Sequence, residues 1–311
     1  MLVAFAGRAP DETASRDGVP PLALDAELSG VVEAEALIEA EALYRDGRAE
    51  EALAAFELIL SREPGSVEAA VGSAIARWPA GTTARLRTLA LASEERAVVH
   101  FHLGFALFWE QREQAAVNAW RDALEAEPDA PAALRAENLL FPEMPRGRPI
   151  VVPSSELAPE LRERALSEQL STLETAARTD LSAKSAIAYG VALQRAGRAI
   201  SAREQFQLAA EREPNNPEAR AAAAVALFEK SDPTPAFAAL GQLSADFPDA
   251  AVVRYHLALM LIWINDVDEA RTQLSKALAT GGNGFYETQA ERLLERLDQS
   301  GTVEPEESES E

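Results

Sequence analysis

The stretch SAREQFQLAAEREP, residues 201–214, carries the pattern that decides the fold. Ala202 and Phe206 are four residues apart, so on a helix they share one face, and Pro214 ends that helix because proline cannot donate a backbone hydrogen bond. The frame recurs at intervals of 34 residues, as Ala236, Leu240 and Pro248 and then as Ala270, Leu274 and Gly282. A fixed period of this length predicts a repeated helix–turn–helix unit.

A second helical pattern precedes each frame and supplies the other helix of the unit. Its small and apolar positions are Gly190 and Leu193, then Ala224 and Leu227, then Leu257, Ala258 and Leu261. Two further units occur in the first half of the chain, one with Leu43, Gly47, Ala52, Phe56 and Pro64, the other with Leu103, Gly104, Leu107, Ala116, Trp120 and Pro128. Residues 67–96, between them, indicate a shortened and degenerate pair.

These units resemble the tetratricopeptide repeat (TPR) family, whose 34-residue unit carries W-x2-L-G-x2-Y, then A-x3-F, then P. The first Trp of that pattern is absent, and the spacing agrees in five units. The resemblance implies an all-α fold, an α-solenoid of helix–turn–helix repeats. It would form two arrays of three helix pairs, each array with a capping helix. Small residues such as Ala202 would let paired helices approach, and large ones such as Phe206 would fill the gap.

The two halves of the chain also resemble each other. AVVHFHLGFALFW begins at Ala97 and AVVRYHLALMLIW begins at Ala251, an offset of 154, while ALYRDGRA and ALQRAGRA are offset by 150. Matching segments at nearly constant offsets predict an internal duplication.

Composition shifts divide the chain. FPEMPRGRPIVVPSS (141–155) carries four prolines and no helical period, which indicates an extended linker. The predicted organisation begins with a disordered N-terminus at 1–21 and a first array at 22–140, which has repeats at about 33–66, 67–96 and 97–130 and a cap at 131–140. The linker at 141–155 leads to a second array at 156–299, which has a leading helix at 156–179, repeats at about 183–216, 217–250 and 251–284 and a cap at 285–298. The chain ends in an acidic, disordered tail at 300–311.

Charge and composition exclude several functions. The net charge of −22 disfavours nucleic acid, because phosphate binding needs a basic surface, and it disfavours anionic membranes for the same reason. There is no cysteine, which excludes thiolate catalysis and cysteine-based metal sites. No apolar window is long enough for a membrane-spanning helix or a signal peptide, so we expect a cytoplasmic protein with no membrane insertion.

No residue set predicts catalysis, a metal or a cofactor. His100 and His102 are two residues apart, about 200° around a helix, so they cannot hold one ion. His102 matches His256 in the second half, which favours a structural role for both. Neither a nucleophile motif nor a phosphate-binding loop is present, and the many carboxylates are most simply a solvated face. We therefore expect no enzyme activity, no cofactor and no metal.

The stretch HFHLGFALFWEQ (100–111) predicts a binding site. Its Phe residues lie on the side of the helix opposite Leu103 and Leu107, and in TPR arrays that side lines a concave groove for peptides. The candidate groove residues are Phe101, Phe105, Phe108, Trp109, Ile187, Val191, Val225, Phe228, Tyr255, Leu259, Ile262 and Trp263.

Three hypotheses follow for these grooves. In the first, each groove holds a partner peptide or helix, and an acidic rim of Glu94, Glu95, Glu110, Asp266 and Asp268 favours basic flanks. In the second, the protein is structural, and its grooves are filled within the chain, by the 22–32 segment, the 156–179 helix or the neighbouring half, or they are filled by a homodimer. In the third, it is a regulatory subunit of an enzyme. The TPR groove that binds chaperone C-termini uses Lys and Asn, which this chain lacks at those positions.

Overall fold

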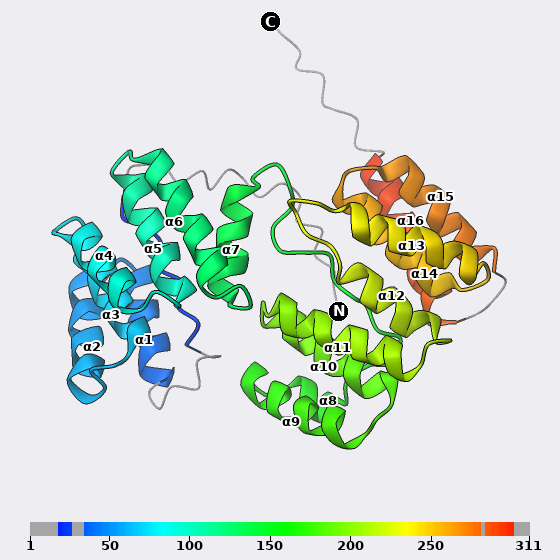
Figure 1. The fold of residues 1–311 in the computed structure, drawn as a ribbon, viewed down its shortest axis with the longest axis horizontal. Coiled ribbons are helices and arrows are strands. Elements are labelled where there is room, and N and C mark those ends of the chain that lie inside the picture. The colour runs from blue at the N-terminus through cyan, green and yellow to red at the C-terminus, as the bar shows by residue number, and fades with distance from the viewer. Residues whose placement is uncertain (1–17, 27–33, 281–283, 302–311) are drawn as a thin grey trace, which may run out of the picture. The chain divides into compact units, whose positions relative to one another are not determined.

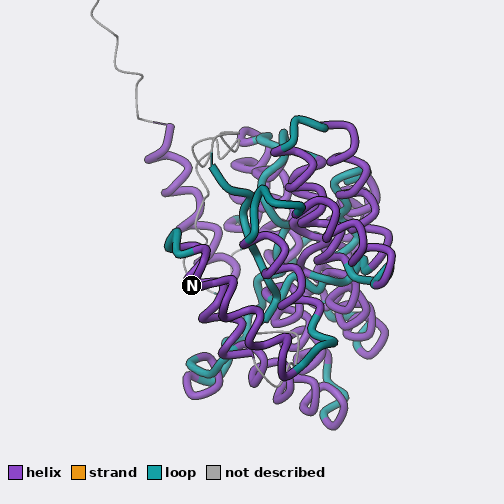
Figure 2. Tube along the Cα trace, turned by 90° about the vertical axis from the view of Figure 1, so that its left-hand side faces the viewer, coloured by secondary structure: helices purple, strands orange, loops and turns teal. Residues whose placement is uncertain are grey.

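The computed structural model describes residues 18–26, 34–280 and 284–301, and every regular element among them is an α-helix (Figures 1 and 2). The predicted all-α fold of tetratricopeptide-like helix pairs is confirmed for these residues. Most of the N-terminus and tail that the sequence predicts to be disordered, residues 1–17 and 302–311, lies outside the described residues.

The chain forms two compact units. Unit 1 contains residues 1–147, 163–171 and 192–201, and unit 2 contains residues 148–162, 172–191 and 202–311. Unit 2 thus begins inside the predicted linker, and unit 1 takes in two short segments that the sequence assigns to the second array.

The helices from the first part of the chain are α1 (Ala34–Arg45), α2 (Ala49–Arg62), α3 (Val67–Ala76), α4 (Thr82–Ala92), α5 (Ala97–Trp109), α6 (Glu113–Ala126) and α7 (Pro131–Leu140). The remaining helices are α8 (Pro159–Arg162), α9 (Leu166–Thr179), α10 (Ala183–Arg195), α11 (Ala199–Arg212), α12 (Pro217–Val225), α13 (Thr234–Asp246), α14 (Ala251–Trp263), α15 (Val267–Leu278) and α16 (Phe285–Gly301). The segment 156–179, which the sequence predicts to form one leading helix or two, contains α8 and α9.

Consecutive helices pack as pairs, and the first helix of each pair also packs on the first helix of the next. In unit 1, α1 contacts α2 and α3, α3 contacts α5, and α5 contacts α6 and α7. In unit 2, α12 contacts α13 and α14, and α14 contacts α15 and α16. We call α1, α3, α5 and α7 the first-helix row of unit 1, and α12, α14 and α16 that of unit 2.

Glycines in the first helices let the aromatic rings of the second helices approach closely. A Cβ added to Gly104 would lie 2.2 Å from Nε1 of Trp120, and one added to Gly190 would lie 2.6 Å from Cε1 of Phe206. Trp120 Nε1 also donates a hydrogen bond to the carbonyl of Phe101, at 3.2 Å. The small-and-large pairing expected from the sequence therefore sets the distance between the paired helices.

Four first helices end in the same turn. The second residue after each helix has a left-handed backbone, and these residues are Gly47, Gln111, Gly197 and Asn265. The next backbone N–H then bonds a carbonyl five residues back, as Arg112 does to Leu107 at 2.9 Å. This geometry satisfies carbonyls at the helix end and reverses the chain within two residues.

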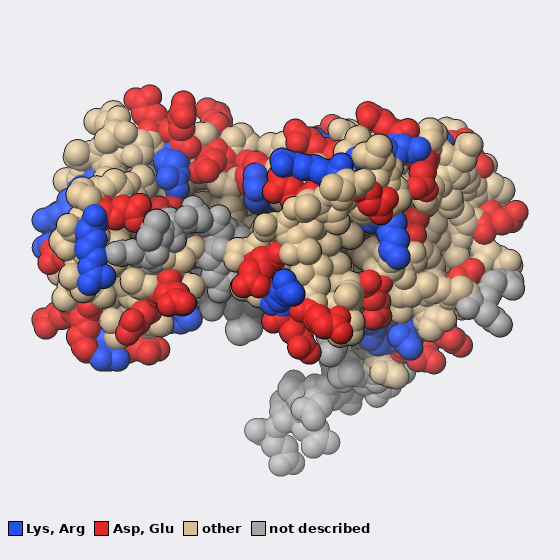
Figure 3. Space-filling model, turned by 90° about the horizontal axis from the view of Figure 1, so that it is seen from below, with Lys and Arg blue, Asp and Glu red and all other residues tan. Residues whose placement is uncertain are grey.

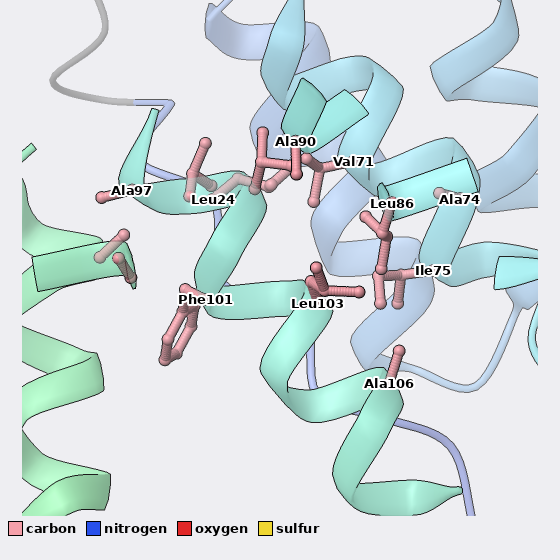
Figure 4. Packing of buried hydrophobic residues seen from close by; sticks show 14 of the residues in the cluster. Leu24, Val71, Ala74, Ile75, Leu86, Ala90, Ala97, Phe101, Leu103 and Ala106 are labelled. Carbon is pink, nitrogen blue, oxygen red and sulfur yellow. The ribbon is translucent and has the colours of Figure 1, made fainter. Parts of the chain in front are cut away.

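The core of unit 1 lies between these helices (Figure 4). Leu37, Phe56 and Leu86 are completely buried in it. Leu24, which precedes α1 and belongs to no helix, is part of the same cluster and lies beside the first turns of α5 in Figure 4. A segment without regular structure thus contributes to the packing of the row.

Candidate binding face

None of the twelve predicted groove residues is exposed. Five are buried, namely Phe101, Ile187, Val225, Phe228 and Tyr255. Seven are half-buried, namely Phe105, Phe108, Trp109, Val191, Leu259, Ile262 and Trp263. The groove as a partner site remains a prediction, and the half-buried residues are the part of it that solvent reaches.

The aromatic residues of α5 form one cluster with α6. The Phe105 ring lies 4.9 Å from Phe101, 5.9 Å from Trp109 and 5.7 Å from Trp120, each in an edge-to-face arrangement. Phe108 lies 6.0 Å from Trp120. Although the sequence places Phe105 and Phe108 opposite the core side of the helix, their large rings reach round to the second helix of their own pair.

Trp109 ends this cluster. Its indole Nε1 is buried and has no acceptor among the described residues. In unit 2 the equivalent end of α14 carries Trp263, whose ring packs edge-to-face on Phe228 at 5.8 Å and lies 5.9 Å from the Lys230 ammonium nitrogen. Each of these two helices therefore ends in a half-buried tryptophan held by aromatic neighbours.

A non-helical segment lies on the first-helix row of each unit. We call residues 19–26 strap 1 and residues 148–155 strap 2. A glycine with positive φ precedes each strap: Gly18 at 112° and Gly147 at 84°. Strap 1 buries Pro20, Leu24 and Ala26, while Pro21 is exposed. Strap 2 buries Pro149 and Val151, while Ile150 is exposed. This alternation of buried and exposed residues is typical of an extended backbone.

His102 holds strap 1 on α5. Its Nδ1 lies 2.7 Å from the Val98 carbonyl oxygen, and the Ala23 backbone N–H donates to its Nε2 at 3.1 Å. A carbonyl only accepts and a backbone N–H only donates, so these partners assign a neutral ring that is protonated at Nδ1. Both ring nitrogens are therefore used, and neither is available to a metal.

His256 holds strap 2 on α14 in the same way. Its Nδ1 lies 2.8 Å from the Val252 carbonyl oxygen, and the Val152 N–H donates to its Nε2 at 3.1 Å. In both straps the residue that donates to the histidine stands three positions after the buried proline. The sequence predicted a structural role for this histidine pair, but not the segments that they bind.

Burial keeps both imidazoles neutral. It lowers the pKa of His102 to about 4, because the protonated ring would lose its hydration in the core, and the positive charge of Arg135 lowers it further. The hydrogen bond to Val98 acts in the opposite direction. Burial also lowers the pKa of His256. At neutral pH both rings can therefore accept a strap N–H.

Three more groups complete the binding of strap 1. The Tyr44 hydroxyl of α1 donates to the Pro20 carbonyl at 2.7 Å, and Leu24 N–H donates to Oε2 of Glu41 at 3.3 Å. Arg135 of α7 forms an ion pair with Asp25 at 2.7 Å. Burial raises the pKa of Asp25 and of Glu41 above their usual range. The strap thus contacts α1, α5 and α7 through polar groups.

Strap 2 has an analogous set in unit 2. The Tyr286 hydroxyl of α16 donates to the Val152 carbonyl at 3.0 Å. The Glu218 carboxylate of α12 accepts from the backbone N–H of Ser154 at 2.7 Å and from its hydroxyl at 2.6 Å. A tyrosine, a glutamate and a histidine therefore bind the segment in each unit, from α1 and α5 in unit 1 and from α12, α14 and α16 in unit 2.

Residues 18–26, 34–280 and 284–301 hold no group of three or more side chains that could bind a metal ion. No helix in the same ranges is both long and apolar enough for a bilayer crossing.

Comparisons with known proteins give only distant likenesses. No family model and no curated protein matches the chain. Similar solved structures include the human IFIT1 dimer with PPP-AAAA (16% identity, 81% of this chain, 60% of that chain, TM-score 0.35). A tetratricopeptide repeat protein from Parabacteroides merdae also matches, with 11% identity over 85% of this chain and 98% of that chain and a TM-score of 0.34. A TPR protein of Thermus thermophilus matches with 20% identity over 62% of this chain and 97% of that chain and a TM-score of 0.29.

The chain spans 60% of the IFIT1 chain and 56% of the matched chain in the APC/C Cut9–Hcn1 complex. The TM-scores of these matches lie between 0.29 and 0.35.

Proposed function

We propose that this chain is a non-catalytic protein-interaction scaffold that contacts a partner peptide or helix through the C-terminal turns of α5 and α14. The observation that carries the proposal is the half-buried aromatic end of α5, where the Trp109 indole N–H is buried without an acceptor among the described residues. A buried N–H that donates no hydrogen bond lowers the free energy of unfolding, because it has lost its hydration without replacement. A partner carbonyl or carboxylate would supply that bond once the Trp109 side chain rotates and exposes its N–H.

The half-buried residues of α14 support the same role in unit 2. Leu259, Ile262 and Trp263 occupy the positions of Phe105, Phe108 and Trp109, and all six are half-buried. Aromatic side chains anchored by neighbours lose little conformational entropy on binding, which is why they are common at the centres of interfaces.

Charge favours a protein partner with basic flanks. The net charge is −22, and the proposed rim residues Glu94, Glu95, Glu110, Asp266 and Asp268 are all exposed. On the face in Figure 3, acidic and basic side chains surround uncharged areas. Such a surface attracts basic segments and repels nucleic acid phosphates.

The test is capture of partners from source-cell lysate on the immobilised full chain, with Trp109→Ala as the variant. The matched control is Leu91→Ala, because Leu91 also lies in unit 1 and is 77% exposed. Proteins retained by the wild type and the control, but not by Trp109→Ala, are then purified and titrated. We expect binding weakened about 30-fold, as for a hot-spot residue worth about 2 kcal/mol. Identical retained proteins on baits of equal helicity would refute the proposal.

The straps favour a second candidate, in which the chain itself fills part of its grooves. Strap 1 belongs to the 22–32 segment and the residues just before it, and it covers the part of the row around His102. The two functions are compatible where the strap covers His102 and a partner covers Trp109. If the grooves are filled completely, neither Trp109→Ala nor Trp263→Ala changes any interaction, and the role is structural.

A further inference from the structure

We propose that the first-helix row of unit 1 is a receptor for an extended, proline-containing segment of a partner protein, and that strap 1 is the intramolecular occupant that this segment displaces. This rests on the proposed scaffold function and names the class of partner.

The row binds strap 1 mainly through backbone groups. The Tyr44 hydroxyl donates a hydrogen bond to the Pro20 carbonyl. His102 accepts one from the Ala23 N–H, and Glu41 accepts one from the Leu24 N–H. Backbone recognition of this kind accepts many sequences, as in the binding of extended peptides to sheet edges. The side chains that it selects are those that the strap buries, a proline and, four positions later, a leucine.

One contact adds charge selectivity. Arg135 pairs with the carboxylate of Asp25, which follows the buried leucine. The recognised segment therefore has the chemistry Pro-x-x-small-Leu-acidic. Its backbone must be extended, since the Pro20 carbonyl and the Ala23 N–H are bound by two different helices, α1 and α5.

Unit 2 shows that this is a recurring kind of site. Strap 2 again has a buried proline, followed three residues later by an N–H that a buried histidine accepts. It again contacts a tyrosine hydroxyl and a glutamate from other helices of the row. Two segments far apart in the sequence are thus bound by the same three side-chain types. That recurrence points to a face built for such a segment.

Competition within the chain sets the expected affinity. A tethered strap has an effective concentration on the order of 1 mM, so a free segment of equal intrinsic affinity binds the intact chain weakly. Weakening the strap frees the row without changing it. The variant is Leu24→Asp/Ala26→Asp, which places charges at two buried strap positions. The matched control is Pro21→Asp, because Pro21 is exposed in the same strap.

The probe is a fluorescein-labelled peptide of residues 18–26, titrated into the full-length chains and followed by fluorescence anisotropy. We expect the weakened variant to bind at least about tenfold more tightly than the wild type or the control. A second peptide, N-methylated at Ala23, lacks the N–H that His102 accepts, and we expect it not to bind. Absence of binding to a variant of wild-type helicity, or equal binding of both peptides, overturns the proposal.

If the weakened variant loses helicity, its thermal midpoint is the readout. The unmodified peptide at about 1 mM should raise that midpoint by several degrees, because a ligand of the folded state stabilises it. The methylated peptide should not, and no response to either peptide overturns the proposal. A wild-type dimer in light scattering that excess peptide dissociates would assign the site to a second copy and overturn the partner assignment. If the peptide results disprove binding at strap 1 but capture of partners still depends on Trp109, the scaffold function stands and only the displacement of strap 1 is refuted.

Discussion

Acidification should destabilise unit 1 through His102. The folded pKa is about 4 against an ordinary value of 6.5. Between these values the unfolded chain binds a proton that the folded chain does not. The free energy of unfolding therefore falls as pH falls from 6.5 towards 4. Each pH unit in that window is worth up to about 1.4 kcal/mol, so acidification from about pH 7.5 to pH 5 removes about 2 kcal/mol.

The comparison is between the wild type and His102→Gln. Glutamine cannot gain a proton and keeps an oxygen that can accept the Ala23 N–H. Asp25 and Glu41 have raised pKa values, which give stability that increases as pH falls. They are present in both proteins, so their effect cancels. His256 likewise titrates in both.

Tryptophan fluorescence can isolate unit 1 in this experiment. Trp78, Trp109 and Trp120 lie in unit 1 and Trp263 lies in unit 2, so both proteins carry Trp263→Phe. Urea denaturation at the two pH values then gives the free energy of unfolding of unit 1. We expect the protein with His102 to lose about 2 kcal/mol more than His102→Gln. An equal loss in the two proteins would refute the neutral, strap-binding histidine.

Three further substitutions, one of them a control, test the packing and the strap by urea denaturation. Gly104→Ala should destabilise unit 1 by about 1–3 kcal/mol, because the new Cβ displaces the Trp120 indole. The control, Gly241→Ala, lies on an open helical surface and should stabilise its helix by up to about 1 kcal/mol. Equal effects of the two would contradict the close helix contact. Tyr44→Phe removes the hydrogen bond to the Pro20 carbonyl and should reduce the stability of unit 1 by about 1 kcal/mol, and no change would show that this bond does not hold the strap.

Much of the helical architecture follows from the sequence, because it depends on local periods. The repeat pattern predicts that small residues let paired helices approach while large residues fill the gap, and Gly104 against Trp120 and Gly190 against Phe206 are contacts of this kind. The sequence places Phe105 on the side of its helix that faces away from the core, but the Phe105 ring contacts Trp120 of the second helix. A helical wheel could not show this, because it locates the Cβ atom and not the end of the side chain.

The straps could not be predicted, because their contacts join distant residues. Ala23 and His102 are 79 positions apart, and the sequence around Ala23 has no helical period. A weak signal existed in GVPPL at 18–22 and GRPIV at 147–151, offset by 129. That offset differs from those of the helices, so it was not part of the repeat pattern. The matching bonds to the two histidines support an internal duplication, which remains a prediction.

Strap 1 changes how unit 1 should fold and unfold. Repeat arrays whose units touch only their neighbours lose their ends first and open piece by piece. Because strap 1 bonds to α1, α5 and α7 together, loosening either end of the row also removes contacts from its middle. Unit 1 should consequently open in one cooperative step. Its folding must close a loop of 79 positions before that step is complete, so cooperativity is gained at the expense of folding speed.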